Sequence, residues 1–399
     1  MVVQLVVASI ATVGGFGEFA LASTTILFLL GAGRAVIAQT DVLRGRPGHD
    51  QSPINAAYLI AGVTLGVGGI LALLGMVEAT GMLTTLGTAT ACSSVFILQD
   101  SARFRCFRMR RSKISFGSDL VVLAAALIGL YLIRDSENIA QNAVLVWSVA
   151  TFLGLIVVAI PIRYFPRRPV QMGWLASQKD LVGPSSGEYL LQSGLPYLLN
   201  WVFVAVGGYD ALAGYRLIQL LFAVVSNLAQ GLNAVTLPRI VDSRSPFIAR
   251  ATMRFEFVVL LAIAAMALFT LFLLPDSWGE FAFGETWIAL GVFLLPGALH
   301  GATNALLFSN FSLLRLLGYA KYSFLVGVWS TLAAVVLVSI GVLLWGAVGA
   351  AWAMAIVAVG GYVVRLVRTS RELRFLTSNC IEIPDRSPKT NIEQEALND

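Results

Sequence analysis

The sequence predicts an all-α membrane protein with about twelve spanning helices, and two features of the chain lead to this fold class. Hydrophobic residues make up 57% of the chain and charged residues only 12%, with a mean hydropathy of +0.81. A soluble chain of this length needs more charge to cover its surface. Apolar runs of roughly 17–25 residues alternate with short polar clusters, and runs of that length fit spanning helices rather than the short alternating strands of a barrel.

The predicted helices follow these apolar runs along the chain. They span residues 2–13, 17–38, 54–76, 79–98, 118–134, 140–162, 187–206, 210–236, 255–274, 286–310, 322–341 and 344–366. The first run is shorter than the roughly 20 residues that cross a bilayer. We therefore expect the true start of the protein to lie upstream, the alternative being a short first helix.

The distribution of lysine and arginine predicts the orientation. Basic residues gather in alternate connections, for example in the segment 103–113, whereas the opposite connections hold almost none apart from Arg134. The longest connection on the opposite side, 275–286, is acidic. Basic loops stay in the cytoplasm, so twelve crossings place both termini there.

The longest internal connection divides the predicted helices into six before and six after. This organisation gives an N-terminal lobe at 1–165 with a short first helix, a cytoplasmic linker at 166–186 and a C-terminal lobe at 187–368. Residues 369–399 form the cytoplasmic tail, whose last part is polar with both signs of charge and is typical of a disordered segment.

The composition argues against metal or covalent chemistry. The two histidines, His49 and His300, lie far apart, and the three cysteines show no paired spacing. No connection gathers a histidine with acidic residues, as a membrane enzyme of polysaccharide assembly would need. We expect no metal, no cofactor, no disulfide and no enzymatic activity.

The helix 210–236 carries the clearest functional pattern. At about 100° per residue, Gln219, Asn227 and Gln230 all lie within about 60° of Arg216. A continuous polar stripe that includes a charge cannot face lipid. Hydrogen bonding between packed helices is the plainer explanation, but the length of the stripe and its arginine favour a water-filled cavity.

Other polar residues within the predicted helices are candidates for the same pathway. Arg34 either lines the cavity or extends to the inner face of the membrane. Glu188 and Gln192 could line an inner vestibule. His300 and Asn304 share one side of their helix, where His300 is either a proton relay or, more simply, a neutral core residue.

The carboxylates of the predicted spanning helices all fall near helix boundaries. An exporter of organic cations is expected to bury an acid near the middle of a helix. A cavity with arginines and no buried acid suits an anionic substrate such as a pyrophosphate.

Four segments resemble the polysaccharide flippases of the multidrug/oligosaccharidyl-lipid/polysaccharide exporter superfamily, of the actinobacterial lipopolysaccharide-biosynthesis type. They are a glycine-rich entry with an Arg-Ala pair at 15–36, a basic connection at 98–120, an arginine-bearing helix with Leu-Pro at its exit at 211–240, and a small-residue helix at 345–356. The resemblance implies alternating access between two six-helix lobes and translocation of a polyprenyl-pyrophosphate-linked oligosaccharide. It also implies that membrane lipids, and unidentified glycan-assembly enzymes, are the partners.

On this interpretation Arg34 and Arg216 hold the pyrophosphate, and Gln219, Asn227 and Gln230 contact the sugar. Three alternatives stay open at this point. The first is an ion-coupled small-molecule exporter of the same fold. The others are a membrane enzyme of polysaccharide assembly and an inactive scaffolding relative.

Overall fold

The computed structural model describes residues 1–38, 52–78, 81–166, 186–187, 189–190, 194–243, 245–317 and 319–379. These residues are helical with short connections, and no strand occurs among them. Within them, nine continuous helical stretches are long and apolar enough to cross a membrane. The chain is thus an all-α, multi-pass membrane protein, as the sequence predicts.

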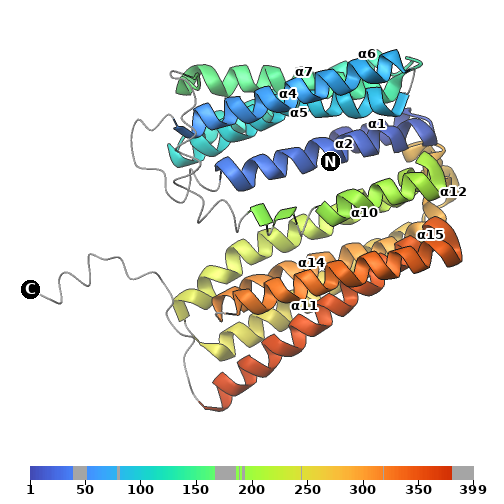
Figure 1. Ribbon diagram of the computed structural model, residues 1–399. Helices are drawn as coiled ribbons and strands as arrows, with labels where there is room; N and C mark the ends of the chain where they lie inside the picture. The colour runs from blue at the N-terminus through green and yellow to red at the C-terminus, as the bar shows by residue number, and fades with distance from the viewer. Residues whose placement is uncertain are drawn as a thin grey trace, which may run out of the picture. The chain divides into compact units, whose positions relative to one another are not determined.

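Figure 1 shows the order of the described helices along the chain. Their bounds are α1 Val2–Ile10, α2 Val13–Gly33, the π-helix η1 Arg34–Ala38, α4 Ser52–Val77, α5 Gly81–Arg108, α6 Ser112–Ile133, α7 Ile139–Ile162, α10 Leu195–Ser243, α11 Pro246–Leu273, α12 Asp276–Phe283, α13 Thr286–Leu290, the 3-10 helix η3 Gly291–Phe293, α14 Leu294–Leu316 and α15 Ala320–Ser378.

Two of these helices are in fact helical hairpins. Gly208 interrupts α10 with φ 71°, and Phe203 stacks on Tyr215 with ring centroids 4.4 Å apart, so the two halves run back along each other. In α15 the break falls at Trp345 and Gly346. A backbone with φ of about 60–70° is one that glycine adopts without strain. If α10 and α15 are each divided at these turns, the nine membrane-crossing stretches of the described residues gain two helices. Together with α1 they match the twelve predicted segments.

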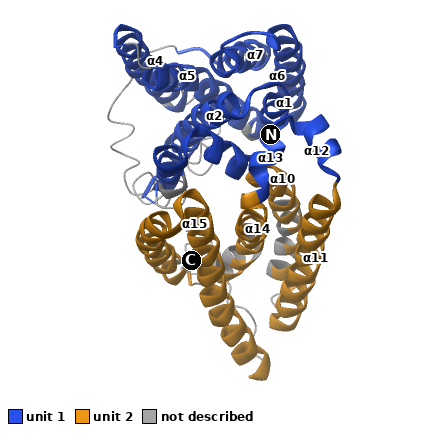
Figure 2. Ribbon diagram, turned by 90° about the vertical axis from the view of Figure 1, so that its right-hand side faces the viewer, with its two compact units in different colours: residues 1–217, 275–291 blue, residues 218–274, 292–399 orange. Residues whose placement is uncertain are grey.

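The chain forms two compact units (Figure 2). Unit 1 comprises Met1–Leu217 with Pro275–Gly291, and unit 2 comprises Ile218–Leu274 with Val292–Asp399. The division into two six-helix lobes with a linker at 166–186 stays a prediction. In the structure the acidic connection 275–286 contains the short helix α12, and α15 continues to Ser378, past residue 369.

Small residues bring α4 and α5 of unit 1 close together. A Cβ on Gly68 would lie 2.1 Å from the backbone nitrogen of Ala91, and a Cβ on Gly87 would lie 2.2 Å from that of Ala72. Spanning helices associate through such close packing, because lipid provides no hydrophobic drive between them. On the other side of α4, Ile70 is 61% exposed, as a lipid-facing side chain should be.

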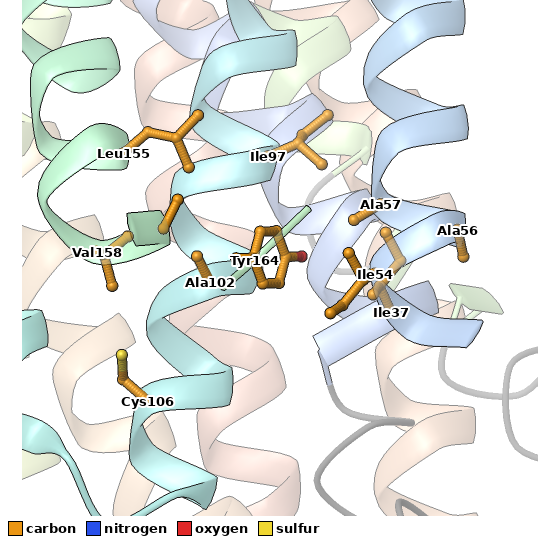
Figure 3. Packing of buried hydrophobic residues seen from close by; sticks show 11 residues of the cluster. Ile37, Ile54, Ala56, Ala57, Ile97, Ala102, Cys106, Leu155, Val158 and Tyr164 are labelled. Atoms are coloured by element: carbon orange, nitrogen blue, oxygen red, sulfur yellow. The ribbon is translucent and has the colours of Figure 1, made fainter. Parts of the chain in front are cut away.

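A buried cluster fixes one end of unit 1 (Figure 3). The ring of Tyr164, which follows α7, lies between Ala102 of α5 and the side chains of Ile37 and Ile54. Tyr58 of α4 donates a hydrogen bond to the carbonyl of Tyr164 at 3.0 Å. The cluster holds η1, α4, α5 and α7 together next to the charged residues described below.

Candidate functional site: the charged network of unit 1

Arg34 and Asp100 form a two-pronged ion pair inside unit 1. Arg34 begins the π-helix η1, and its Nε and Nη2 donate to Oδ2 and Oδ1 of Asp100 at 2.6 and 2.7 Å. Single π-helical turns within α-helices often mark functional sites. The Asp100 side chain is 5% exposed and that of Arg34 is 44% exposed. The carboxylate is therefore enclosed, whereas part of the guanidinium stays open to solvent or ligand.

Arg103 links this pair to the next helix. Its Nη1 lies 3.6 Å from Asp100 Oδ1, and its Nη2 lies 2.9 Å from Oδ2 of Asp119 in α6. Gln99 donates to the Ser118 hydroxyl at 3.2 Å. Two arginines and two aspartates thus form one chain of ion pairs across η1, α5 and α6, and their formal charges sum to zero.

A second polar cluster of unit 1 lies along α2, well before Arg34. Thr85 of α5 donates a short hydrogen bond to Glu18 Oε1, and Gln141 of α7 donates to the Thr85 hydroxyl at 3.2 Å. Gly17, the neighbour of Glu18, packs directly on the backbone of Tyr209, where a Cβ would lie 2.0 Å from the carbonyl oxygen. This contact fixes α2 against the turn of the α10 hairpin.

Aromatic side chains cover the stretch of α2 between these two clusters. Phe28 stacks on Tyr197 of α10 with ring centroids 4.7 Å apart, and on Tyr189 at 5.9 Å. The Tyr189 hydroxyl donates to the carbonyl of Phe28 at 2.8 Å, and that of Tyr197 lies 3.3 Å from Thr25 Oγ1. The stretch of α2 that precedes Arg34 is therefore packed against aromatic rings whose hydroxyl groups form hydrogen bonds.

The structure overturns the expectation that spanning helices hold no buried acid. Asp100 was expected in a loop because the apolar run ends at residue 98, yet α5 continues to Arg108. Glu256 was expected at a helix start, yet α11 begins at Pro246 and buries Glu256 to 5% exposure. In both cases the helix extends beyond the apolar run, because a helix need not end where the lipid does.

The polar stripe of α10 spans the boundary between the units in the sequence. Arg216 belongs to unit 1, and Gln219 and Asn227 belong to unit 2. Arg216 and Gln219 are half-buried and Asn227 is exposed. The side chain of Gln230 is outside the described residues. The stripe as a substrate path stays a prediction.

Among the predicted residues that the structure describes, His300 and Asn304 lie apart from the network of unit 1 and pair with each other. In unit 2, Asn304 Nδ2 donates to Nε2 of the buried His300 at 3.1 Å. An amide nitrogen only donates, so the ring is neutral in this arrangement. Glu188 and Gln192 are outside the described residues. Within the described part of the chain, no group of three or more histidine, cysteine or acidic residues could hold a metal ion.

Sequence comparison identifies no family, because no family model matches the chain and a search of curated proteins gave no match. Comparison of structures does identify similar folds. Lipid II flippase MurJ in its inward closed conformation matches with TM-score 0.72 and 11% identity, over 95% of this chain and 87% of that one. The chain has the fold of the MOP-superfamily transporters.

Two further structures support this assignment of the fold. A multidrug resistance MATE family transporter in an inward-facing conformation matches with TM-score 0.63 and 15% identity, over 94% of each chain. A MOP superfamily transporter from Pyrococcus furiosus matches with TM-score 0.53 and 12% identity, over 94% of this chain and 91% of that one. Each match extends over almost the whole chain, so the likeness in fold is not confined to one of the two units.

Proposed function

We propose that the protein is a flippase that moves a polyprenyl-pyrophosphate-linked oligosaccharide across a bacterial cytoplasmic membrane by alternating access. The observation that carries the proposal is the whole-chain likeness to MurJ, which is described as a lipid II flippase. Its TM-score of 0.72 exceeds the 0.63 of the MATE transporter. Both termini lie in the cytoplasm on this proposal.

The partly exposed guanidinium of Arg34 supports an anionic substrate. Asp100 is buried and holds two arginines, so it is not available as a counter-charge for a cationic substrate. Arg34 uses two of its five N–H donors on Asp100, and its 44% exposure leaves the others within reach of a phosphate. A guanidinium fixed by one carboxylate is well placed to bind a second anion, because its orientation is already set.

The remaining roles follow from the sequence. Arg216 is the second residue for the pyrophosphate. The polar side chains that pass the sugar are those of Gln219, Asn227, Gln230, Glu188, Gln192, His300 and Asn304. The prenyl tail stays in the lipid throughout.

A second candidate function is ion-coupled export of a small molecule. It is favoured by Glu256, a buried acid of unit 2 of the kind that such exporters need, and by the likeness to the MATE transporter. The two functions differ in the charge of the substrate. Direct assay of both substrate classes therefore separates them.

The test is a translocation assay in proteoliposomes. A fluorescent polyprenyl-pyrophosphate oligosaccharide is placed in both leaflets, and a membrane-impermeant quencher reports the fraction that reaches the outer one. We expect complete quenching with the protein and about half without it. Uptake of an organic cation with no movement of the glycan lipid would establish export instead.

Two arginine variants test the site in the same assay. Arg216→Ala should lower the rate of glycan-lipid movement by about tenfold or more, as expected for the loss of one charge-assisted contact. Arg134→Ala is the matched control, because Arg134 is 51% exposed at the end of α6 and pairs with the exposed Asp135. Equal rates for the two variants would remove Arg216 from the site.

A further inference from the structure

Two arginines at the basic end of unit 1 adopt a backbone conformation that is rare for residues other than glycine. Arg110, in the turn between α5 and α6, has φ 56°, and Arg163, at the end of α7, has φ 51°. They are the only non-glycine residues with positive φ among those that the structure describes. In both turns the next residue donates its backbone N–H to the carbonyl five residues earlier, at 2.8 and 2.9 Å. This is the Schellman turn that commonly ends a helix, and each arginine occupies the position where glycine is most common.

The left-handed conformation costs free energy at both positions, because arginine has a Cβ that glycine lacks. Elsewhere in the described chain the residues with positive φ are glycines, such as Gly208 and Gly346. A cation at the end of a helix interacts favourably with the helix dipole, but from the last helical turn it would do so without strain. Unfavourable backbone conformations that persist are concentrated at functional sites. The positive charge at these two positions therefore points to a ligand.

A hydrogen bond joins the two turns. Arg111 Nη1 donates to the carbonyl of Pro161 at 3.4 Å, near the end of α7, where helix carbonyls lack a donor within the helix. Tyr164, which follows Arg163, fills the buried cluster of Figure 3 and so fixes the end of α7 against α5. Lys113 lies in the first turn of α6. Four exposed cationic side chains thus come from two turns that contact each other.

These charges have no counter-charge within the described part of unit 1. The chain holds no aspartate or glutamate from 101 to 118 or from 139 to 165. The two acids that flank the first stretch already belong to the charged network described above. Arg110, Lys113 and Arg163 form no ion pair with any described residue. The cluster is therefore complementary to an anion.

Lipid-facing side chains lead up to the cluster from two helices. Phe116 and Leu120 of α6 lie one turn apart and are exposed, and so is Ile160 of α7. Phe107 and Phe165, beside the two turns, are exposed as well. Apolar faces that end in aromatic and basic residues are typical of the level at which acyl chains meet headgroups. A ligand that fits here has a phosphate for the cations and acyl chains for the apolar faces, which free phosphate lacks.

We propose that Arg110, Arg111, Lys113 and Arg163 bind the phosphate of an anionic phospholipid, whose acyl chains lie along α6 and α7. Arginine donates several N–H groups to phosphate oxygens, and clustered cations at the bilayer surface attract anionic lipids. On the predicted orientation this lipid belongs to the cytoplasmic leaflet. The site uses none of the residues assigned to the transported substrate. It attaches unit 1 to a lipid that stays in its own leaflet.

Native mass spectrometry of the purified full-length protein measures the site without any transport. Phosphatidylglycerol and phosphatidylcholine with the same acyl chains are titrated separately, and we expect the anionic lipid to bind at least about tenfold tighter. Arg110→Gly/Arg163→Gly should weaken phosphatidylglycerol binding by about 25-fold, from about fivefold for each charge near the surface. Phosphatidylcholine binding should not change.

The matched control removes two charges from unit 2. Arg371 and Arg374 are exposed near the end of α15, and Arg371→Gln/Arg374→Gln should leave phosphatidylglycerol binding unchanged. An equal loss in this control would show that net charge, and not the two turns, attracts the lipid. Displacement of phosphatidylglycerol by inorganic phosphate would assign the cluster to a free anion. Either result would overturn the proposal.

Thermal unfolding separates loss of the lipid site from loss of the fold. Glycine relieves the left-handed conformation, so Arg110→Gly/Arg163→Gly without added lipid should have a Tm equal to or above that of the wild-type protein. Arg110→Ala/Arg163→Ala keeps the strain, so it should lose the lipid equally and unfold at a lower temperature than the glycine variant. Added phosphatidylglycerol should raise the Tm of the wild-type protein only. A glycine variant that unfolds below the wild-type protein would mean that the arginines serve folding, which would contradict the proposal.

Discussion

Replacement of Asp100 by asparagine tests the charged network of unit 1. The two side chains have nearly the same shape, so packing is kept while the charge is lost. The asparagine amide presents one acceptor and one donor, so one of the two contacts with Arg34, now 2.6 and 2.7 Å, becomes donor against donor. Arg103 loses its link to the pair as well.

The expected loss of stability follows from burial. Hydrogen bonds to charged groups contribute about 1.5–3 kcal/mol each, and breaking a fully buried ion pair costs about 3–5 kcal/mol. Asp100 is 5% exposed, but Arg34 is 44% exposed and recovers part of its hydration. We therefore expect a loss of about 2 kcal/mol, which for a large chain corresponds to about 4 °C in Tm.

Thermal unfolding in detergent, followed with a thiol-reactive fluorophore, measures this loss. Cys106 is fully buried and Cys92 is half-buried, so both react on unfolding; a Cys380→Ser background confines the signal to these two. Asp135→Asn is the control, because Asp135 is 87% exposed in its pair with Arg134. It should change stability by less than about 0.5 kcal/mol. Equal Tm values for the two variants would refute the network as a stabilising element.

Three further substitutions test the packing around the site in the same unfolding assay. Gly17→Ala should cost about 2 kcal/mol, because its Cβ would meet the Tyr209 carbonyl at 2.0 Å; Gly62→Ala, which meets nothing within 4 Å, should be neutral or slightly stabilising. Tyr164→Ala should cost about 3–5 kcal/mol by emptying the cluster of Figure 3, and a cost under about 1 kcal/mol would contradict that packing. Arg103→Gln should lower stability by about 1 kcal/mol, less than Asp100→Asn, because the buried Asp100 carboxylate keeps its main partner, Arg34. A loss larger than that of Asp100→Asn would mean that Arg103, and not Arg34, is the main partner.

The number and type of helices could be predicted because a segment that crosses the lipid must be a long apolar helix. The ends of the helices could not be predicted from hydropathy, because a helix can continue beyond its apolar run into the membrane–water interface. Ser245 and Pro246 carried a usable signal: serine at the N-cap and proline at the first helical position are typical of a helix start. Ser245 does cap α11 by accepting from the backbone of Ile248. A helix that begins at Pro246 contains Glu256 well inside it.

The partners within the site were harder to predict from the sequence. Arg34 could be singled out as a charge in an apolar helix, but its partner Asp100 is far along the chain and depends on how α5 packs against α2. The pairing of Arg103 with Asp119 likewise depends on the turn between α5 and α6. Single residues are visible in the sequence, whereas the balance of charges between helices is a property of the packed structure.

The most direct test of the proposed function compares two substrates that differ only in the pyrophosphate. A fluorescent polyprenyl-pyrophosphate oligosaccharide and a neutral polyprenyl glycoside with the same sugar are assayed in the same proteoliposomes. The account predicts that the wild-type protein moves the charged lipid at least about tenfold faster and that Arg216→Ala loses most of this preference. Equal rates for both lipids in the wild-type protein would contradict recognition of the pyrophosphate by arginine.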